Sequence, residues 1–276
     1  MAQPLPKLGL IAGGGQIPAL VRDICSEQRR ELFIAALNGF CDPATIAGAD
    51  HDWFDLPRVG RLLNALHTAR VEQVCLCGRV SKPDFATLKP DWKGALLLPK
   101  IIKAARFGDD AILRVVVEVL EKEGFGVVGV EQIVSDLLVQ NRPYSGQAPT
   151  ASQWADIRIG IAAARELGRA DRGQGVIVSS GVVVAQEDDA GTDAMLRRMK
   201  DEASARQGVL VKCAKPQQDR RVDLPTVGAT TIENAAAAGL AGVAVEAGAA
   251  LMVDAAGTAS AADKFGLFLI GFDGDG

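Results

Sequence analysis

Short apolar runs alternate with amphipathic segments along the first half of the chain. Three of these runs are too short for helices and predict buried strands, at residues 8–12, 32–37 and 73–78. Between the last two runs, residues 59–69 place leucines on one side of a predicted helix. Buried strands that alternate with such helices are typical of a parallel sheet. We therefore expect an α/β protein with a Rossmann-like N-terminal domain over residues 1–135.

The second half has a different pattern. Two apolar runs at residues 174–178 and 182–185 are joined by Ser179-Ser180-Gly181, which predicts a β-hairpin. Further strands are predicted at residues 209–215, 242–245, 250–253 and 267–272. We expect a distinct, mixed α/β C-terminal domain over residues 150–276. Its first helix begins at Thr150, and a linker rich in Pro, Gly and polar residues precedes it at 136–149.

Composition and charge exclude several classes of function. The net charge of −4 argues against nucleic-acid binding, which needs a basic face. Five scattered cysteines without a CxxC pair predict reduced core thiols, and two isolated histidines exclude a histidine-rich dinuclear metal site. The N-terminus leads directly into a strand rather than a signal peptide, and no apolar run approaches the length of a membrane span. We expect a cytoplasmic protein; peripheral membrane contact and homo-oligomer formation stay open.

A glycine-rich turn follows the first predicted strand. Gly13, Gly14, Gly15 and Gln16 precede a helix that is expected to start near Pro18. Backbone amides in such a turn can approach a phosphate at the positive end of the helix. The spacing is neither GxGxxG nor that of a P-loop. A nucleotide-binding turn and a tight turn that serves only packing are comparably good interpretations.

A second polar loop follows the strand at residues 73–78. It contains Arg79, Ser81 and Lys82. In open α/β sheets, ligands bind beyond the carboxyl ends of the strands, where this loop and the Gly13 turn both belong. We therefore expect both segments at the ligand-binding edge of the sheet.

The segment 220–228 combines two arginines with one carboxylate. Arg220 and Arg221 precede Asp223, and Pro225 restricts the backbone before Thr226. Upstream, the predicted strand that starts at Val209 carries Lys212 and ends at Lys215. Several cations around one acid suit a phosphate or pyrophosphate substrate. From these residues alone, a surface loop with a solvated ion pair is the slightly favoured interpretation.

Five stretches together resemble one family. They are Leu8-Gly-Leu-Ile-Ala-Gly-Gly-Gly, Gly78-Arg-Val-Ser-Lys-Pro-Asp-Phe85, Gly108-Asp-Asp-Ala-Ile-Leu-Arg114, Gly191-Thr-Asp-Ala-Met-Leu-Arg-Arg198 and Arg221-Val-Asp-Leu-Pro-Thr-Val-Gly228. The chain resembles the LpxI-type UDP-2,3-diacylglucosamine pyrophosphatases of Gram-negative lipid A synthesis. The resemblance covers nearly the whole length in the same order and departs from the family pattern at residues 136–147.

The resemblance implies a two-domain enzyme with the substrate, a lipid-linked UDP-sugar, between the domains. Such an enzyme cleaves the pyrophosphate to UMP and 2,3-diacylglucosamine 1-phosphate (lipid X). The family depends on a divalent cation, typically Mg²⁺, and water is thought to attack the β-phosphorus. The family's essential aspartate corresponds to Asp223.

The expected site combines this implication with the residues themselves. Asp223 either binds the metal or orients the attacking water, and the sequence leaves both roles open. Asp193, Asp109 and Asp110 are secondary metal candidates, although a role at a helix start suits each of them better. The expected substrate-binding residues are Gly13, Gly14, Gly15, Gln16, Arg79, Ser81, Lys82, Gly191, Thr192, Lys212, Lys215, Arg221 and Thr226. Magnesium or another divalent cation fits this oxygen-rich set.

Two other functions compete with this hypothesis. One is a non-catalytic sugar-nucleotide or lipid-binding protein in which Asp223 is a structural acid. The other is a nicotinamide-dependent oxidoreductase, which the missing dinucleotide fingerprint disfavours.

Overall fold

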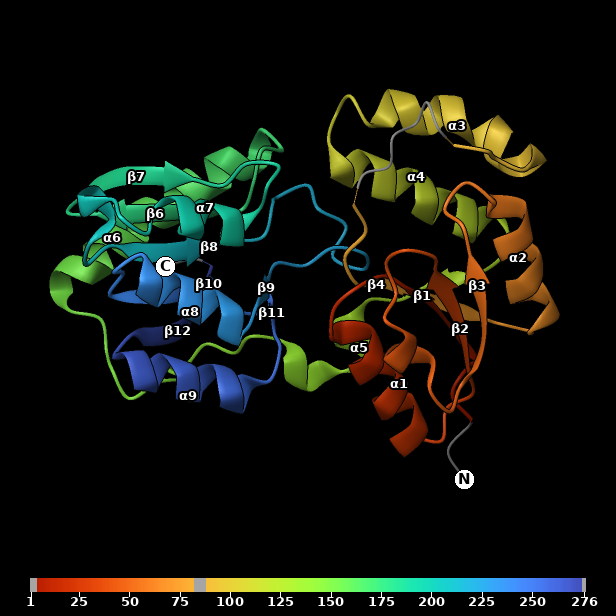
Figure 1. Ribbon diagram of the computed structural model, residues 1–276, viewed down its shortest axis with the longest axis horizontal. Helices are drawn as coiled ribbons and strands as arrows, with labels where there is room; N and C mark the ends of the chain where they lie inside the picture. Colours follow the sequence, from red (N-terminus) through yellow and green to blue (C-terminus); the bar gives the residue numbers. More distant parts are fainter. Residues whose placement is uncertain (1–3, 82–87, 275–276) are drawn as a thin grey trace. The chain divides into compact units, whose positions relative to one another are not determined.

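The computed structural model describes residues 4–81 and 88–274, and the chain divides into two compact units (Figure 1). The first unit comprises Met1–Ser135 together with Asp219–Asp223. The second comprises Asp136–Gln218 and Leu224–Gly276. Five residues from the second half of the chain therefore belong to the first unit.

The first unit is built on a parallel five-stranded sheet in the order β3-β2-β1-β4-β5. This order confirms the predicted Rossmann-like architecture. All five residues of the central strand are buried, as expected where helices cover both faces of a sheet. The strands are β1 (Leu8–Ala12), β2 (Leu32–Leu37), β3 (Asp50–Phe54), β4 (Gln73–Cys77) and β5 (Gly126–Val127).

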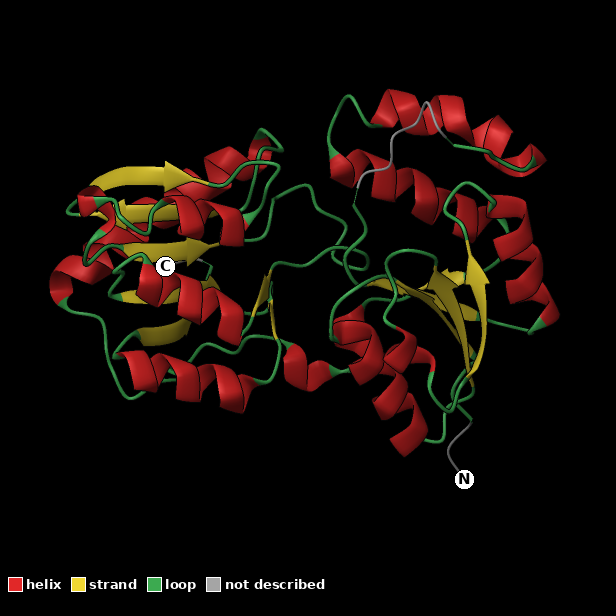
Figure 2. Ribbon diagram, in the orientation of Figure 1, coloured by secondary structure: helices red, strands yellow, loops and turns green. Residues whose placement is uncertain are grey.

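Helices cover this sheet on both sides (Figures 1 and 2). On one face, leucines and valines of α2 and α4 pack against Ile11 and Phe33 of the sheet, and α1 and α5 lie on the other face. The elements are α1 (Ile17–Glu27), α2 (Val59–Thr68), α3 (Trp92–Ala104), α4 (Asp109–Lys122), α5 (Val130–Ile133) and the 3-10 turns η1 (Pro43–Ile46) and η2 (Ser135–Leu137).

The sequence pattern did not indicate α3. Pro99 lies inside this helix, and exposed apolar side chains obscure the amphipathic spacing. Asp91 caps the helix, because its side chain accepts a hydrogen bond from the Gly94 N–H at 2.8 Å. The helix packs against α2 and α4.

The second unit contains a mixed sheet in the order β12-β10-β8-β6-β7. The first three strands are parallel, and β6 and β7 form the predicted antiparallel hairpin. A separate parallel pair joins β9 to β11. The strands are β6 (Gly175–Ser179), β7 (Val182–Gln186), β8 (Val209–Lys212), β9 (Thr226–Val227), β10 (Gly242–Glu246), β11 (Leu251–Met252) and β12 (Phe268–Phe272).

Helix α6 packs on one face of this sheet, and the core on the other face includes side chains of α7, α8 and α9. The predicted start of α6 is confirmed, since Thr150 and Gln153 form a reciprocal capping box. The helical elements are α6 (Ala151–Arg169), α7 (Thr192–Arg198), α8 (Ala229–Ala237), α9 (Ala255–Phe265) and the 3-10 turn η3 (Ala203–Ala205).

Residues 136–149, for which composition predicts a linker, pack within the second unit. Val139 is 1% exposed, and its N–H donates to the carbonyl of Ala250 at 2.9 Å. The N–H of Tyr144 donates to the carbonyl of Leu269 at 2.8 Å. This stretch, with its Pro and Gly residues, is therefore an irregular segment whose backbone is hydrogen-bonded to strands and loops of the second unit.

No helix among the described residues is both long and apolar enough to cross a bilayer.

Candidate functional site

Two strand ends of the first unit meet at the point where the strand order reverses. The chain proceeds from β1 to β2 on one side and later returns to place β4 on the other side. Ligands of such sheets bind beyond the carboxyl ends at this switch point. Here the Gly13 turn follows β1, and the Arg79 loop follows β4.

The structure brings these two predicted segments together. Gly14 and Arg79 exchange two backbone hydrogen bonds, Gly14 N–H to the Arg79 carbonyl at 2.9 Å and Arg79 N–H to the Gly14 carbonyl at 2.8 Å. The side chains of Arg79 and Ser81 are exposed beside this bridge. Lys82, the third predicted residue of the loop, lies outside the described residues.

Close backbone approach explains most of the glycines at this point. A Cβ on Gly13 would lie 2.7 Å from the Arg79 carbonyl oxygen, and one on Gly14 would lie 2.9 Å from the Phe40 carbonyl oxygen. Gly78 has a φ of +94°, and its added Cβ would lie 2.7 Å from the Gly13 carbonyl carbon. Only Gly15, with a φ of +95°, has open space around its Cβ position. Packing therefore accounts for Gly13 and Gly14 without a ligand.

Helix α1 begins directly after this turn. Its N-cap is Gln16, whose side chain makes no capping hydrogen bond, and its first turn contains no acidic residue. Amides at the start of a helix are not satisfied within the helix and favour an anion. The N–H groups of Gly13 and Gly14 already donate to the carbonyls of Cys77 and Arg79, so a phosphate at this turn would use those of Gly15, Gln16 and Ile17.

The segment 219–223 is held on the first unit by Arg221 and Val222. The Arg221 guanidinium donates to both carboxylate oxygens of Asp219, at 3.0 and 2.7 Å, and to Glu121 Oε1 of α4 at 2.7 Å. Val222 packs against the hydrophobic cluster of this unit. Arg221, which we predicted as a phosphate ligand, is therefore bound to two carboxylates.

These contacts change the ionisation of both partners. The hydrogen bonds from Arg221 hold the pKa of the Asp219 carboxyl below its usual value. The same bonds, with those to Glu121, raise the pKa of Arg221. Asp219 was not singled out from the sequence; its position two residues before Arg221 was the available signal.

Asp223 closes the same turn. The N–H groups of Val222 and Asp223 both donate to the Asp219 carbonyl, at 3.0 and 3.2 Å. The residue is half-buried. Because Arg221 fixes Asp219, it also fixes the backbone that carries the Asp223 carboxylate.

In the second unit, Lys212 ends strand β8 and is only 4% exposed. Its ammonium donates to the Thr226 carbonyl at 3.2 Å. No carboxylate in the described part of the chain forms an ion pair with it. A buried charge with so few partners is unfavourable unless an anion joins it.

Lys215 has a different environment. Its ammonium forms an ion pair with Asp171 at 2.7 Å, and the two side chains are 12% and 14% exposed. Lys215 therefore ties the loop after β8 to the end of α6. The structure gives this lysine a structural partner, whereas it gives Lys212 none of opposite charge among the residues described.

The predicted residues Gly191, Thr192 and Asp193 form the start of α7. Gly191 is the N-cap with a φ of +84°, so neither side chain caps this helix as we had expected. The buried hydroxyl of Thr192 donates to Glu187 Oε2 at 2.9 Å. The Thr231 hydroxyl donates to Asp193 at 3.4 Å.

Glu187 is a buried acid that the sequence reading missed. A Cβ on Gly175 would lie 2.7 Å from its Oε2, and Gly175 pairs with Lys212 across β6 and β8. Paired residues of neighbouring strands point to the same face of a sheet. The Glu187 carboxylate therefore lies on the same face as Lys212 and next to its strand.

The acidic residues proposed for metal do not form a ready-made site. Asp109 and Asp110 lie in the first turn of α4, after the N-cap Gly108, where a negative charge suits the positive end of the helix. Among the residues described, no group of three or more His, Cys, Asp or Glu side chains is placed to hold a metal ion. A protein-only metal cage is thus not part of the described structure.

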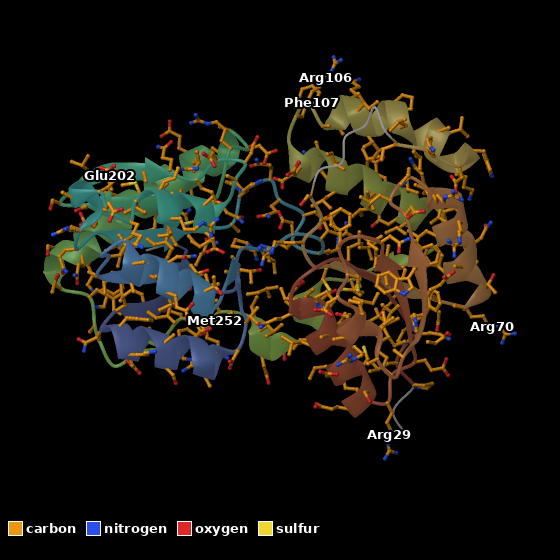
Figure 3. The ribbon with its side chains drawn as sticks, in the orientation of Figure 1. Arg29, Arg70, Arg106, Phe107, Glu202 and Met252 are labelled. Carbon is orange, nitrogen blue, oxygen red and sulfur yellow. The ribbon has the colours of Figure 1, made fainter. Side chains whose placement is uncertain are left out.

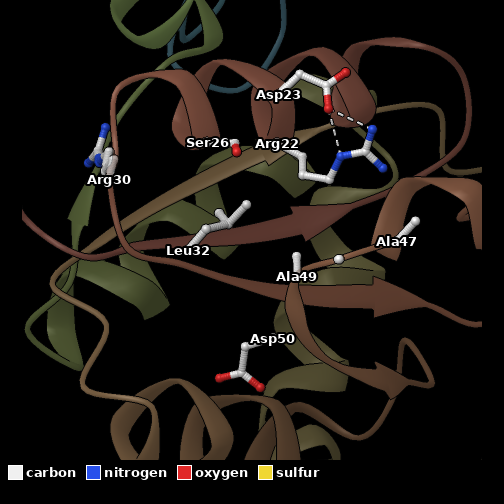
Figure 4. A pocket seen from close by; sticks show the side chains of 9 residues that line it. Arg22, Asp23, Ser26, Arg30, Leu32, Ala47, Ala49 and Asp50 are labelled. Atoms are coloured by element: carbon white, nitrogen blue, oxygen red, sulfur yellow. Dashed lines mark hydrogen bonds and ion pairs between the residues drawn. The ribbon is translucent and has the colours of Figure 1, made fainter.

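A cavity of about 390 Å³ lies elsewhere in the first unit (Figure 4). Leu32 and Asp50, which start β2 and β3, line it, so it opens at the amino edge of the sheet. Its main cation, Arg22, donates to Asp23 at 2.6 and 2.8 Å and to the Ala44 carbonyl at 2.6 Å. This cavity is on the edge opposite the Gly13 turn, and we assign it no role.

Comparison with known proteins covers nearly all of the chain. The family model of the LpxI N-terminal domain matches residues 7–137, and that of the LpxI C-terminal domain matches residues 140–270. The chain is 43% identical to the UDP-2,3-diacylglucosamine pyrophosphatase LpxI of Caulobacter vibrioides, over 97% of this chain and 98% of that protein. The chain belongs to the LpxI family.

Proposed function

We propose that this chain hydrolyses the pyrophosphate of UDP-2,3-diacylglucosamine to UMP and 2,3-diacylglucosamine 1-phosphate, a step of lipid A synthesis. The observation that carries this proposal is the 43% identity with the Caulobacter pyrophosphatase over almost the full length of both proteins. The water oxygen forms a bond to the β-phosphorus, the bond from this phosphorus to the bridging oxygen breaks, and UMP leaves.

Asp223 is the proposed catalytic residue. Its backbone is held in the turn that Arg221 and Asp219 secure, which would limit the positions of its carboxylate. A carboxylate there can orient the attacking water and accept its proton, or it can bind a metal ion. Arg221 acts through Asp219 as a positioning residue in this proposal.

Magnesium is compatible with the available donors when the substrate supplies the others. Mg²⁺ is commonly held by one or two carboxylates together with substrate phosphates and water. Asp223 would be the protein ligand, and the bound ion would neutralise charge on the pyrophosphate. Asp109 and Asp110 stay weaker candidates because the first turn of α4 already favours acids, and Asp193 because the Thr231 hydroxyl donates to it.

Two further parts of the chain are proposed to bind phosphate groups. The Lys212 ammonium is buried with one carbonyl partner, so a substrate phosphate would complete its surroundings. The Gly13–Gln16 turn at the switch point is suited to the nucleotide phosphate or uridine. Thr192 and Thr226 would shape the site near Lys212 rather than carry charge.

The two acyl chains of the proposed substrate would hold it in a lipid bilayer, so the enzyme would act at the membrane surface. We propose a cytoplasmic protein that contacts the inner membrane peripherally, with homo-oligomer formation compatible with it. No nucleic-acid partner is proposed.

The proposal is tested with purified protein, detergent-dispersed UDP-2,3-diacylglucosamine and Mg²⁺ in ¹⁸O-labelled water. We expect UMP release, with the label in 2,3-diacylglucosamine 1-phosphate. Label in UMP would place the attack on the other phosphorus. Saturable binding of the lipid nucleotide without any UMP release would instead support the non-catalytic binding protein.

A further inference from the structure

Helix α3 presents large apolar side chains to the exterior of the first unit. Trp92 is 69% exposed, Leu96 is 68% exposed, and Phe107, just beyond the helix, is 67% exposed. The helix packs on α2 and α4, and its buried residues are Gly94 and Ala104. Leu97, Leu98 and Ile101 are partly buried, whereas Trp92 and Leu96 face outward, where an ordinary surface helix carries polar residues.

The outward residues form one stripe along the helix. Trp92, Leu96, Pro99 and Lys103 follow at i, i+4, i+7 and i+11, which places them on one side of a helix. Figure 3 shows Arg106 and Phe107 extending away from the ribbon at the end of this stripe. The exposed surface is therefore continuous along α3 and the turn that follows.

The charges on this surface have one sign. Lys100, Lys103 and Arg106 are exposed, and their side chains make no ion pair or hydrogen bond with the residues that the structure describes. No acidic residue occurs between Trp92 and Gly108, in a chain whose net charge is −4. Lys93 is different, because it is bound to Glu123 at 2.7 Å.

Aromatic and aliphatic side chains beside lysines and arginines suit the interface of an anionic bilayer. Trp rings and leucines enter the boundary between headgroups and acyl chains, while cations attract acidic lipids. A second copy of the chain is a poorer partner for this face. A two-fold interface would place the same basic patch against itself.

We propose that α3 with residues 105–107 docks the protein on an anionic lipid bilayer. This inference rests on the proposed function to the extent that a diacylated substrate resides in such a bilayer. The contact explains why Trp92, Leu96 and Phe107 are left exposed. It also gives the peripheral membrane contact a defined surface.

The test measures co-sedimentation with vesicles of phosphatidylcholine, with and without phosphatidylglycerol. We expect the wild type to bind the anionic vesicles and to dissociate as salt rises. K100Q/K103Q should weaken binding by about fivefold for each charge. W92Q/L96Q should weaken it by about tenfold. The control R197Q/K200Q removes two exposed cations of the second unit and should bind like the wild type.

Three outcomes would overturn the inference. One is binding that does not depend on phosphatidylglycerol, and another is wild-type binding by W92Q/L96Q. The third is a wild type that is dimeric by light scattering and does not bind vesicles, with a monomeric W92Q/L96Q, because the face would then join two copies. Circular dichroism checks that each variant is folded.

Activity assays separate this inference from the proposed function. With substrate in detergent micelles, both α3 variants should release UMP at the wild-type rate. With substrate in anionic vesicles, they should be slower by the factor lost in binding. Absence of UMP in both assays, with intact vesicle binding, would count against the proposed function alone.

Discussion

The guanidinium group of Arg221 donates a hydrogen bond of 2.7 Å to the carboxylate of Glu121, a residue 100 positions earlier in the chain. This bond ties the segment 219–223 to α4 of the first unit. Asp223 lies at the end of that segment. The position of the proposed catalytic carboxylate thus depends on an arginine that faces protein carboxylates.

Removing either partner of this ion pair should reduce catalysis more than stability. The pair is partly exposed, so its loss should cost no more than about 1 kcal/mol in the free energy of unfolding. A displaced carboxylate can cost up to about a hundredfold in rate. We expect Arg221→Gln to lower kcat by between about tenfold and a hundredfold, and Glu121→Gln to lower it less.

A double-mutant cycle of these variants checks the positioning role. If Arg221 acts through Glu121 and Asp219, the double variant should be no slower than Arg221→Gln alone. Fully additive losses would mean that the two side chains act independently. Melting temperatures of all three variants should lie within a few degrees of the wild type.

The Asp219–Arg221 pair should make stability depend on acid. Arg221 depresses the pKa of Asp219 in the folded state, so the pair stabilises the fold at pH values above the unfolded pKa, about 3.9. This contribution is lost as pH falls below that value and Asp219 takes up a proton. The difference in unfolding free energy between wild type and Asp219→Asn should be constant from neutral pH to about pH 5 and shrink in stronger acid. A difference that grows in acid would contradict the assignment.

Alanine at Gly13 should separate the two strand-end loops of the first unit. The new Cβ would meet the Arg79 carbonyl oxygen at 2.7 Å, and backbone atoms cannot yield as a flexible side chain can. We expect a loss of about 1–3 kcal/mol in unfolding free energy and weaker substrate binding. Gly146→Ala is the matched control, because its nearest neighbour would be at 3.5 Å, an ordinary contact. Equal stability of the two variants would show that the Gly14–Arg79 bridge is not tightly held.

Lys212 and Lys215 should respond in opposite ways to replacement by Met. Lys212→Met removes a buried charge that has no ion-pair partner among the described residues, so stability should be unchanged or higher, while activity falls by about a hundredfold or more. Lys215→Met leaves Asp171 with its nearly buried charge uncompensated and should cost about 3 kcal/mol. Thermal melts and UMP release measure both effects. A fully active Lys212→Met would remove this lysine from the proposed site.

Sequence patterns predicted the elements that are determined by residues close together in the chain. The buried strands, the hairpin of β6 and β7, and the capping box of Thr150 and Gln153 each depend on neighbours within a few residues. The predicted parallel sheet also placed the Gly13 turn and the Arg79 loop at the same edge of the sheet, because the carboxyl ends of parallel strands lie on one side. Helix α3 was not predicted because Pro99 lies inside it and the exposed Trp92 and Leu96 obscure its amphipathic spacing.

The environment of each cation could not be predicted from sequence. Arg221 and Lys215 look like phosphate ligands in the sequence, but each binds a carboxylate that is distant in the chain, Glu121 and Asp171 respectively. Only Asp219, the second partner of Arg221, is close to it in sequence. Lys212 looks like Lys215 in sequence, but in the described part of the fold its ammonium contacts the Thr226 carbonyl and no carboxylate. Likewise, the N-cap residues of α4 and α7 are Gly108 and Gly191 rather than the polar residues that follow them.

The rate of UMP release by Asp223→Asn, compared with wild type, tests the central claim most directly. Asparagine keeps the size of the side chain and removes the negative charge that would bind metal or accept a proton. We predict a variant that folds like the wild type and loses at least about a thousandfold in kcat, with Asp201→Asn, an exposed acid, fully active. Release of UMP by Asp223→Asn at the wild-type rate would contradict the account.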